Sequence, residues 1–331
     1  MFAKPLRRVR TVVGIATAAV VTSLLSIGGA GSAQADDLLP YVPWSSYLPG
    51  WTDQYIPSSD NDCVAGRPNC LKGTLKEQAR IADDTAKSCS HNAVFARAYV
   101  RMTQLYGYTR DIPGYYQDVP YFNHVDAVFA RYYTDAYYNW QGGNRSAVPK
   151  AWLIAFDAAK GKKVSGSGDL LLGMNAHINR DLPFVMAAVG LVGPDGSSRK
   201  PDYDAVEKWL YDATMPLTAE LAARFDPAMD DTGDPFGISN WTLFQMVSGW
   251  REQAWRNAEA LASAPTPEAR ALVAASIEAN ANAIAQSLVL TQSYGLLSSS
   301  ASRDSFCAAH NADAPPVPYD FGYAAAFGAA Y

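Results

Sequence analysis

The sequence predicts an all-α fold, a single-domain multi-helix bundle preceded by an irregular N-terminal arm rich in Pro, Trp and Tyr. Three observations predict this class. After residue 75, apolar residues recur three and four positions apart over most of the chain, which is the helical spacing. No segment alternates polar and apolar residues for long enough to form a convincing strand. No internal repeat or composition shift indicates a second domain, and the length is sufficient for one large core.

Residues 1–35 have the pattern of a signal peptide. A basic start precedes an apolar run from Thr11 to Ser26, and Ala33-Gln34-Ala35 supplies a small-residue cleavage site. We therefore expect a secreted, extracellular protein. No other segment has the roughly 20 apolar residues that stable membrane insertion requires. Removing the four basic residues of the signal changes the formal charge from −5 to −9, which disfavours nucleic acid as a partner.

Residues 36–71 form the predicted arm, because the four prolines between residues 38 and 62 oppose a regular helix. The many aromatic residues in this arm argue against a disordered tail. The helical domain is expected at 72–331. Its helical stretches are expected at about 75–107, 121–139, 147–160, 166–180, 183–192, 202–224, 239–263 and 267–294, and Gly- or Pro-containing breaks separate most of them.

The exported chain retains four cysteines, at Cys63, Cys70, Cys89 and Cys307. An even number of cysteines in an exported protein favours disulfides. Four cysteines allow three pairings. We favour Cys63–Cys70, which closes a short loop, together with Cys89–Cys307, which ties an early helix to the C-terminal region. The alternative of a zinc site is weak, because the spacings match no paired Cys-x-x-Cys motif.

The most informative motif is "GMNAHINRDLP" at residues 173–183, where an apolar run ends in several polar residues. If the helix continues through it, His177 and Asp181 lie at i and i+4 on one face, where two ligands can meet one metal ion. Pro183 disfavours helix just before it, so Asp181 can instead cap the next helix. A structural hydrogen-bonded pair, metal binding and acid–base catalysis are three interpretations of this pair.

Two further histidines are candidate metal ligands beside His177 and Asp181. His124 lies in a tyrosine-rich segment, in which the hydroxyl-tipped rings suit either the wall of a wet pocket or a core helix that reaches the surface. His91 follows Cys89 by two positions, and a lone histidine on an apolar helix is more often a core residue than a ligand.

Charged and aromatic residues of the stretch 239–263 complete the candidate site. Arg251 and Glu252 are expected either to orient the catalytic groups or to interact with the charge of Asp181 in a buried polar network. The candidate substrate-binding residues are Asn175, Asn179, Tyr132 and Trp255.

Two resemblances bear on these residues. An apolar helix that leads into His-x-x-x-Asp is similar to helical zinc phosphodiesterases of the phospholipase C type, which have a further histidine shortly after the Asp, where this chain has "DLPFVM". The aromatic arm with its cysteine pair, "CSHNAVFARAY" and above all "LLLGMNAHINRDLP" resemble an exported actinobacterial family without an established activity. That second resemblance covers most of the mature chain and implies one helical domain, but no chemistry.

Two functions follow as hypotheses. In the first, two or three of the candidate ligands hold a divalent metal, zinc as the first choice, and the metal acidifies a water that hydrolyses an ester or phosphoester of a lipid or the cell envelope. In the second, the protein is a non-catalytic binder of an apolar, small-molecule or lipid-like ligand, and the His and Asp groups are structural. A purely structural envelope protein is a third possibility. The decisive feature is whether His91, His124, His177 and Asp181 gather around one point.

Overall fold

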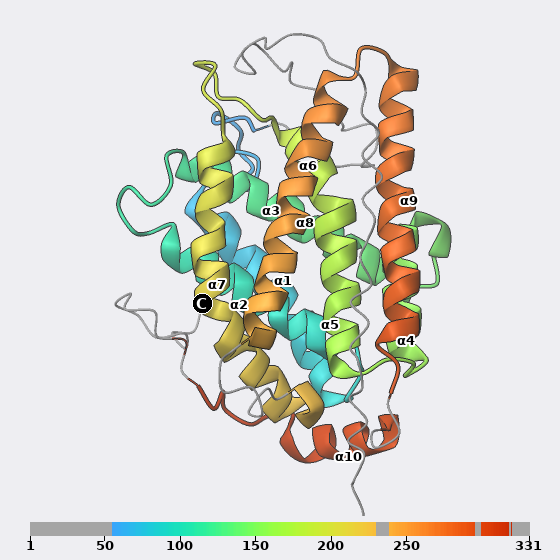
Figure 1. Cartoon of the computed structure of the whole chain (residues 1–331). Coiled ribbons are helices and arrows are strands. Elements are labelled where there is room, and N and C mark those ends of the chain that lie inside the picture. Colours follow the sequence, from blue (N-terminus) through green and yellow to red (C-terminus); the bar gives the residue numbers. More distant parts are fainter. Residues whose placement is uncertain (1–54, 230–237, 295–298, 318, 320–331) are drawn as a thin grey trace, which may run out of the picture. The chain divides into compact units, whose positions relative to one another are not determined.

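Within the residues that the structure describes, the first α-helix begins at Pro68. The computed structural model describes residues 55–229, 238–294, 299–317 and 319. The α-helices in these ranges are α1 (Pro68–Lys87), α2 (Ala93–Thr109), α3 (Val119–Gln141), α4 (Lys150–Lys160), α5 (Gly166–Met174), α6 (Leu182–Val189), α7 (Lys200–Arg224), α8 (Ile238–Ser263), α9 (Pro267–Thr291) and α10 (Ser300–His310). The shorter elements are the π-helix η3 (Asn175–Asp181) and the 3-10 turns η2 (Arg145–Ala147) and η4 (Pro227–Met229). These ranges contain no strand, so the predicted all-α single-domain bundle is confirmed (Figure 1).

Part of the predicted organisation lies outside the described residues. The expected signal peptide at 1–35 and positions 36–54 of the arm belong to that part. Residues 55–67 of the arm contain no helix and lead into α1, which begins four residues before the predicted domain boundary at 72. No helix within the described ranges is both long enough and apolar enough to cross a lipid bilayer.

The predicted helix at 75–107 is two helices, α1 and α2, and the prediction of one continuous stretch was wrong. The break spans residues 88–92, where Cys89 has φ +48°. A non-glycine residue in this left-handed region interrupts the regular turn, and Ser and Asn beside it readily compete for backbone hydrogen bonds. Local periodicity did not reveal the break, because apolar positions continue on both sides of it.

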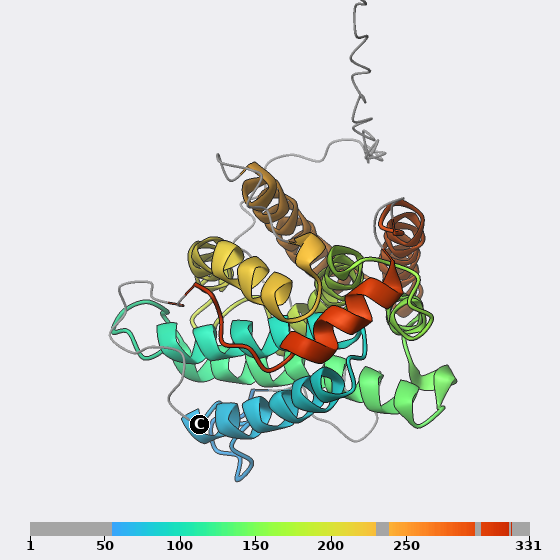
Figure 2. The same ribbon diagram turned by 90° about the horizontal axis from the view of Figure 1, so that it is seen from below.

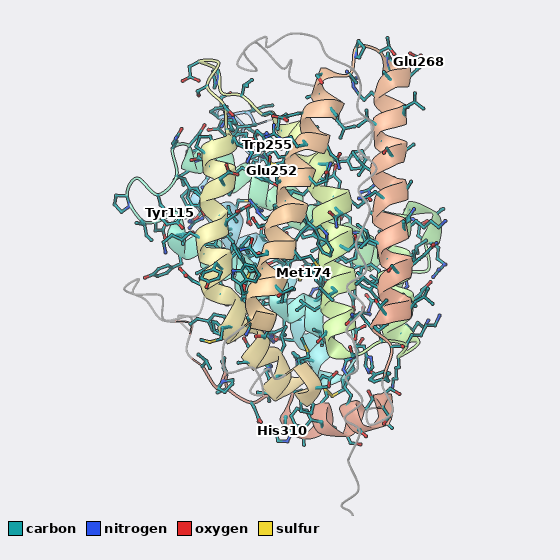
Figure 3. All side chains as sticks on the ribbon, in the orientation of Figure 1. Tyr115, Met174, Glu252, Trp255, Glu268 and His310 are labelled. Atoms are coloured by element: carbon teal, nitrogen blue, oxygen red, sulfur yellow. A yellow bond between two sulfur atoms is a disulfide. The ribbon has the colours of Figure 1, made fainter. Side chains whose placement is uncertain are left out.

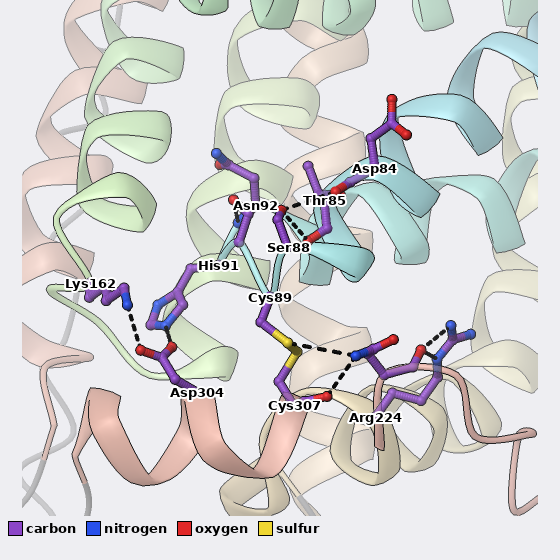
Figure 4. Close-up of a disulfide and its surroundings, with 12 residues drawn as sticks. Asp84, Thr85, Ser88, Cys89, His91, Asn92, Lys162, Arg224, Asp304 and Cys307 are labelled. Atoms are coloured by element: carbon purple, nitrogen blue, oxygen red, sulfur yellow. Dashed lines mark hydrogen bonds and ion pairs between the residues drawn. A yellow bond between two sulfur atoms is a disulfide. The ribbon is translucent and has the colours of Figure 1, made fainter. Parts of the chain in front are cut away.

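Both predicted disulfides are present. Cys63–Cys70 closes a loop of seven residues at the start of α1, and Cys89–Cys307 joins the break between α1 and α2 to α10. Figure 4 shows the second bridge. The side-chain amide of Asn311 donates to Cys89 Sγ beside it. A bridge that spans 218 residues of sequence restricts the unfolded chain far more than one that spans seven.

The segment that contains the central motif is one continuous helical column, α5–η3–α6. The polypeptide passes through a π-helical stretch at Asn175–Asp181 before α-helix resumes at Leu182. Pro183 has no N–H to donate to the preceding turn, and the wider π turn lies just ahead of it. Gly173 lets the column approach α2 closely, because a Cβ at this position would overlap the Phe95 ring. π-helical turns occur frequently at functional sites.

The column lies at the centre of the packing. It contacts α2, α3, α4, α8 and α9, and in Figure 1 it runs beside α8 and α9 with α7 on the far side of α8. Helices α1, α2 and α3 pack against one another behind this layer, and Figure 2 shows α10 lying across one end of the bundle. Functional groups on η3 are therefore enclosed by helices from both halves of the chain.

Helix α10 was not predicted. Its N-cap Ser299 accepts a hydrogen bond from the Ser302 amide, and its packing face carries Arg303 and Cys307, which are both buried. The sequence of α10 is polar and rich in serine, so apolar periodicity does not reveal this packing face. His310, expected in a loop, is the last residue of α10 and bonds Asp313 at the surface.

Candidate functional site

An apolar cavity of about 180 Å³ lies among α2, α3, the α5–η3–α6 column, α7 and α8. Aromatic and aliphatic side chains form most of its wall, among them Phe95, Met102, Phe122, Phe129 and Trp209. Half-buried lining residues such as Leu210, Thr214 and Phe244 belong to α7 and α8, and they mark the mouth of the cavity between these helices. A concave, mainly apolar space with a few polar groups is the usual form of a small-molecule site.

His177, on η3, contributes a polar edge to this wall. Its Nδ1 donates a hydrogen bond to Asp181 Oδ2 at 3.1 Å, so the predicted i,i+4 pair forms. Asp181 also accepts from Trp152 Nε1 at 2.8 Å and from an Arg180 guanidinium nitrogen at 3.0 Å. A carboxylate with three donors holds the His177 ring in the Nδ1–H tautomer, which leaves Nε2 as an acceptor.

The imidazole of His177 is buried and neutral. Burial lowers its pKa, and the hydrogen bond to Asp181 opposes this shift only in part. The ring stacks on Phe129 with centroids 3.5 Å apart and an interplanar angle of 6°, and it meets the edge of Tyr99 at 4.5 Å. Within the described residues, Nε2 is buried and has no hydrogen-bond partner. The ring is thus fixed in place with one acceptor unsatisfied.

Helix α2 supplies two hydroxyl groups to the same wall. Tyr99 and Thr103 lie one turn apart, line the cavity and are at least nine-tenths buried. Neither hydroxyl has a hydrogen-bond partner in the part of the chain that the structure describes. Burial, followed by the carboxylates of Asp126 and Asp181, raises the pKa of Tyr99 well above its usual value, so Tyr99 stays protonated. An unsatisfied buried hydroxyl costs about 1–3 kcal/mol, so two of them at one site need an explanation.

Asp126, on α3, adds a carboxyl group to the cavity wall. Burial raises its pKa to about 7, and the distant guanidinium of Arg110 opposes the shift. No ion pair or hydrogen bond of its side chain is found within the described ranges. Sequence analysis missed this residue, although Phe122, Asp126 and Phe129 follow an i, i+4, i+7 pattern in which one carboxyl interrupts an apolar helical face.

The predicted metal ligands do not gather. His124 is fully buried and its Nδ1 bonds the carbonyl of Cys63 at 2.8 Å. His91 bonds Asp304 at the α10 end (Figure 4), and it also bonds Arg303. Among the described residues, no group of three or more His, Cys, Asp and Glu side chains could hold a metal ion. The break after α1 directs His91 toward α10, and His124 faces the arm.

The predicted catalytic residues on α8, Arg251 and Glu252, do not belong to one site either. Arg251 lines the cavity, but it donates to the Tyr203 carbonyl at 2.5 Å and stacks over the Tyr203 ring. Glu252 is at the surface and pairs with Lys200 and Arg256. Figure 3 shows Glu252 well apart along the bundle from Met174, which lines the cavity. Adjacent residues of a helix point about 100° apart, so they rarely serve one site.

The four predicted substrate-binding residues do not line the cavity. Asn175 donates to the carbonyl of Ala281 and so joins the column to α9, and Asn179 donates to the Asn175 side chain within η3. Trp255 donates to Glu259 one turn later, and Tyr132 is buried in the core. Their polar groups therefore have structural contacts.

Comparison with known proteins gives one match. The model of DUF5995, a family of unknown function, matches residues 71–291, and the chain belongs to this family. The matched range contains every lining residue of the cavity and the whole α5–η3–α6 column. No curated protein and no solved structure matches the chain.

Proposed function

We propose that this member of DUF5995 is an exported binding protein that holds an apolar small molecule in the cavity beside His177. The observation that carries the proposal is the cavity itself, about 180 Å³ of space with an almost wholly apolar wall. Export is supported by the signal-like residues 1–35 and by the two disulfides.

Energetics favour a role for this space. Unfilled apolar space forgoes packing contacts, so it lowers stability unless a ligand fills it. An apolar cavity of about 150 Å³ in another protein binds benzene, so a small aromatic or branched hydrocarbon fits the scale of this one.

Binding accounts for the geometry better than metal-dependent hydrolysis does. The hydrolase hypothesis requires His91 or His124 to reach His177 and Asp181, whereas each of the three histidines has its own surroundings. The aromatic wall, by contrast, is in direct contact with the His177 ring.

The test is calorimetric titration of the purified protein with p-cymene, an apolar ligand of ten carbon atoms. We expect one binding site, and a higher melting temperature as p-cymene is added, because a ligand that binds only the folded state stabilises it. Ala98→Leu fills the cavity from its wall and Thr214→Phe narrows its mouth, and each is expected to weaken binding at least tenfold.

Ala275→Leu, on the exposed face of α9, is the matched control and should bind p-cymene like the wild type. Circular dichroism verifies that each variant is folded. Absence of p-cymene binding to the wild type, or equal binding by folded Ala98→Leu and Thr214→Phe variants, would contradict the proposal.

A further inference from the structure

The polar atoms of the cavity wall gather at one end of it. The rings of Tyr99 and His177 are 4.5 Å apart, and Thr103 lies one helical turn beyond Tyr99. Phe129, one turn from Asp126 on α3, stacks directly on His177. Most of the remaining wall is apolar, and its charged side chains are Asp126 and Arg251.

These atoms demand a particular set of hydrogen bonds. His177 Nε2 is an acceptor, because Nδ1 carries the proton that is given to Asp181. Tyr99 and Thr103 each have a hydroxyl hydrogen to donate, and neither has an acceptor among the described residues. Among these three residues the unsatisfied set is one acceptor and two donors, all on side chains that are at least nine-tenths buried. Arg251 Nε is a further buried donor of the wall without a hydrogen bond in the described residues, and it lies 3.8 Å from a Glu207 oxygen.

We propose that the ligand of this cavity is an apolar alcohol, whose hydroxyl group donates to His177 Nε2 and accepts from Tyr99 and Thr103. A hydroxyl group has one hydrogen and two lone pairs, which matches the unsatisfied set atom for atom. The inference rests on the proposed binding function and specifies the class of its ligand.

Other head groups match less well. A carboxylate only accepts, so it would leave Nε2 unsatisfied, and it would enter a site that already contains the Asp126 carboxyl group near the charge of Asp181. An ammonium group only donates, so it would leave the hydroxyl hydrogens of Tyr99 and Thr103 without acceptors. The cation that lines the cavity, Arg251, is already bonded to the Tyr203 carbonyl and lies 3.8 Å from a Glu207 oxygen.

Four ligands of one shape test the inference by calorimetry at pH 6.5: p-cymene, 4-isopropylbenzyl alcohol, 4-isopropylbenzoate and 4-isopropylbenzylamine. We expect the wild type to bind the alcohol at least tenfold more tightly than each of the other three. His177→Phe and Tyr99→Phe should reduce the advantage of the alcohol over p-cymene, measured for the same variant, to less than threefold.

His310→Phe is the matched control, because His310 lies on α10 and does not line the cavity. It should keep the full preference for the alcohol. Thr103→Val removes one hydrogen-bond donor and keeps the shape of the side chain. It should reduce the preference for the alcohol over p-cymene at least twofold.

The outcomes separate the two proposals. Binding of p-cymene without any preference for the alcohol would overturn this inference and leave the binding function intact. Tightest binding of the benzoate would identify Arg251 as the anchor, tightest binding of the amine would identify Asp126, and either result would overturn the inference. Failure of all four ligands to bind would overturn the binding function itself.

Discussion

Two buried histidines of this chain differ in one respect that separates structure from function. His91 uses both ring nitrogens: Nε2 donates to Asp304 at 3.0 Å, and Nδ1 accepts from Arg303 at 2.8 Å. His177 uses one, since Nδ1 bonds Asp181 and Nε2 faces the cavity wall without a partner in the described residues. Both rings are almost completely buried. Burial is therefore the same for both histidines, whereas the number of satisfied nitrogens differs, and this difference is why we propose His177 and not His91 as a residue of the binding site.

The His91 cluster, which consists of His91, Asp169, Arg303 and Asp304, holds α10 against the bundle. Arg303 on α10 pairs with Asp169 on α5 at 2.5 Å, and Lys162 pairs with Asp304 beside it. The Cys89–Cys307 bridge crosses the same junction (Figure 4). Ion pairs and a disulfide thus fasten α10 to the bundle in place of a large apolar face.

The largest effect is expected for Arg303→Met. Removal of the guanidinium leaves the carboxylate of Asp169 and one nitrogen of His91 buried without a donor, so the unfolding free energy should fall by about 3–5 kcal/mol. Urea denaturation measures this change. Affinity for p-cymene should stay within twofold of the wild type, because Arg303 does not line the cavity. A loss below about 1 kcal/mol would contradict the structural role of the His91 cluster.

A pair of matched substitutions sharpens the comparison. His91→Phe breaks two bonds and should lower the unfolding free energy by about 2–3 kcal/mol, whereas His177→Phe breaks one and should lower it by about 1 kcal/mol. Asp181 retains its bonds to Trp152 and Arg180 in the second variant. Urea denaturation of both variants at pH 7 gives the two values. Equal losses would mean that His177 is as fully committed to the fold as His91.

The pH dependence of stability differs between the two histidines and the carboxyl group of the cavity. Burial, followed by the Arg303 charge, lowers the pKa of His91 to about 4, and burial lowers that of His177. At these two histidines the unfolded chain therefore binds more protons than the folded chain below about pH 6.5, and their contribution to stability is lost as the pH falls from there. Asp126 acts in the opposite sense, because its raised pKa makes ionisation costly in the folded state, and stability is lost as the pH rises toward 7.

The effect expected for Asp126→Asn is a gain in stability, and it depends on pH. At pH 8 the carboxylate is ionised at a cost, so the neutral amide should raise the unfolding free energy by about 1–2 kcal/mol. At pH 5 the carboxyl group is protonated in the folded state, and the substitution should change stability by less than about 0.5 kcal/mol. Thermal denaturation at the two pH values measures the difference. A benefit at pH 5 that equals the benefit at pH 8 would show that ionisation of Asp126 has no part in it.

Much of the local structure followed from the sequence. Helical periodicity located most of the helices within a few residues, and the spacing of His177 and Asp181 predicted their hydrogen bond. The favoured cysteine pairing was also confirmed. These features depend on residues close in sequence, or on a small number of possible pairings, so a linear pattern suffices for them.

The site itself depended on tertiary structure. A cavity is the sum of many side-chain volumes from distant helices, and no periodicity along one segment records it. Tyr99, Thr103 and Asp126 become candidates only when α2 and α3 face η3 and the missing partners of their polar atoms can be seen. For the same reason His91 and His124 looked like neighbours of His177 in sequence terms, although the break after α1 and the packing of α3 direct them elsewhere. Sequence determined which helices form, because hydrogen bonds and side-chain faces repeat locally, and only the packing of those helices decided which polar atoms remain unsatisfied.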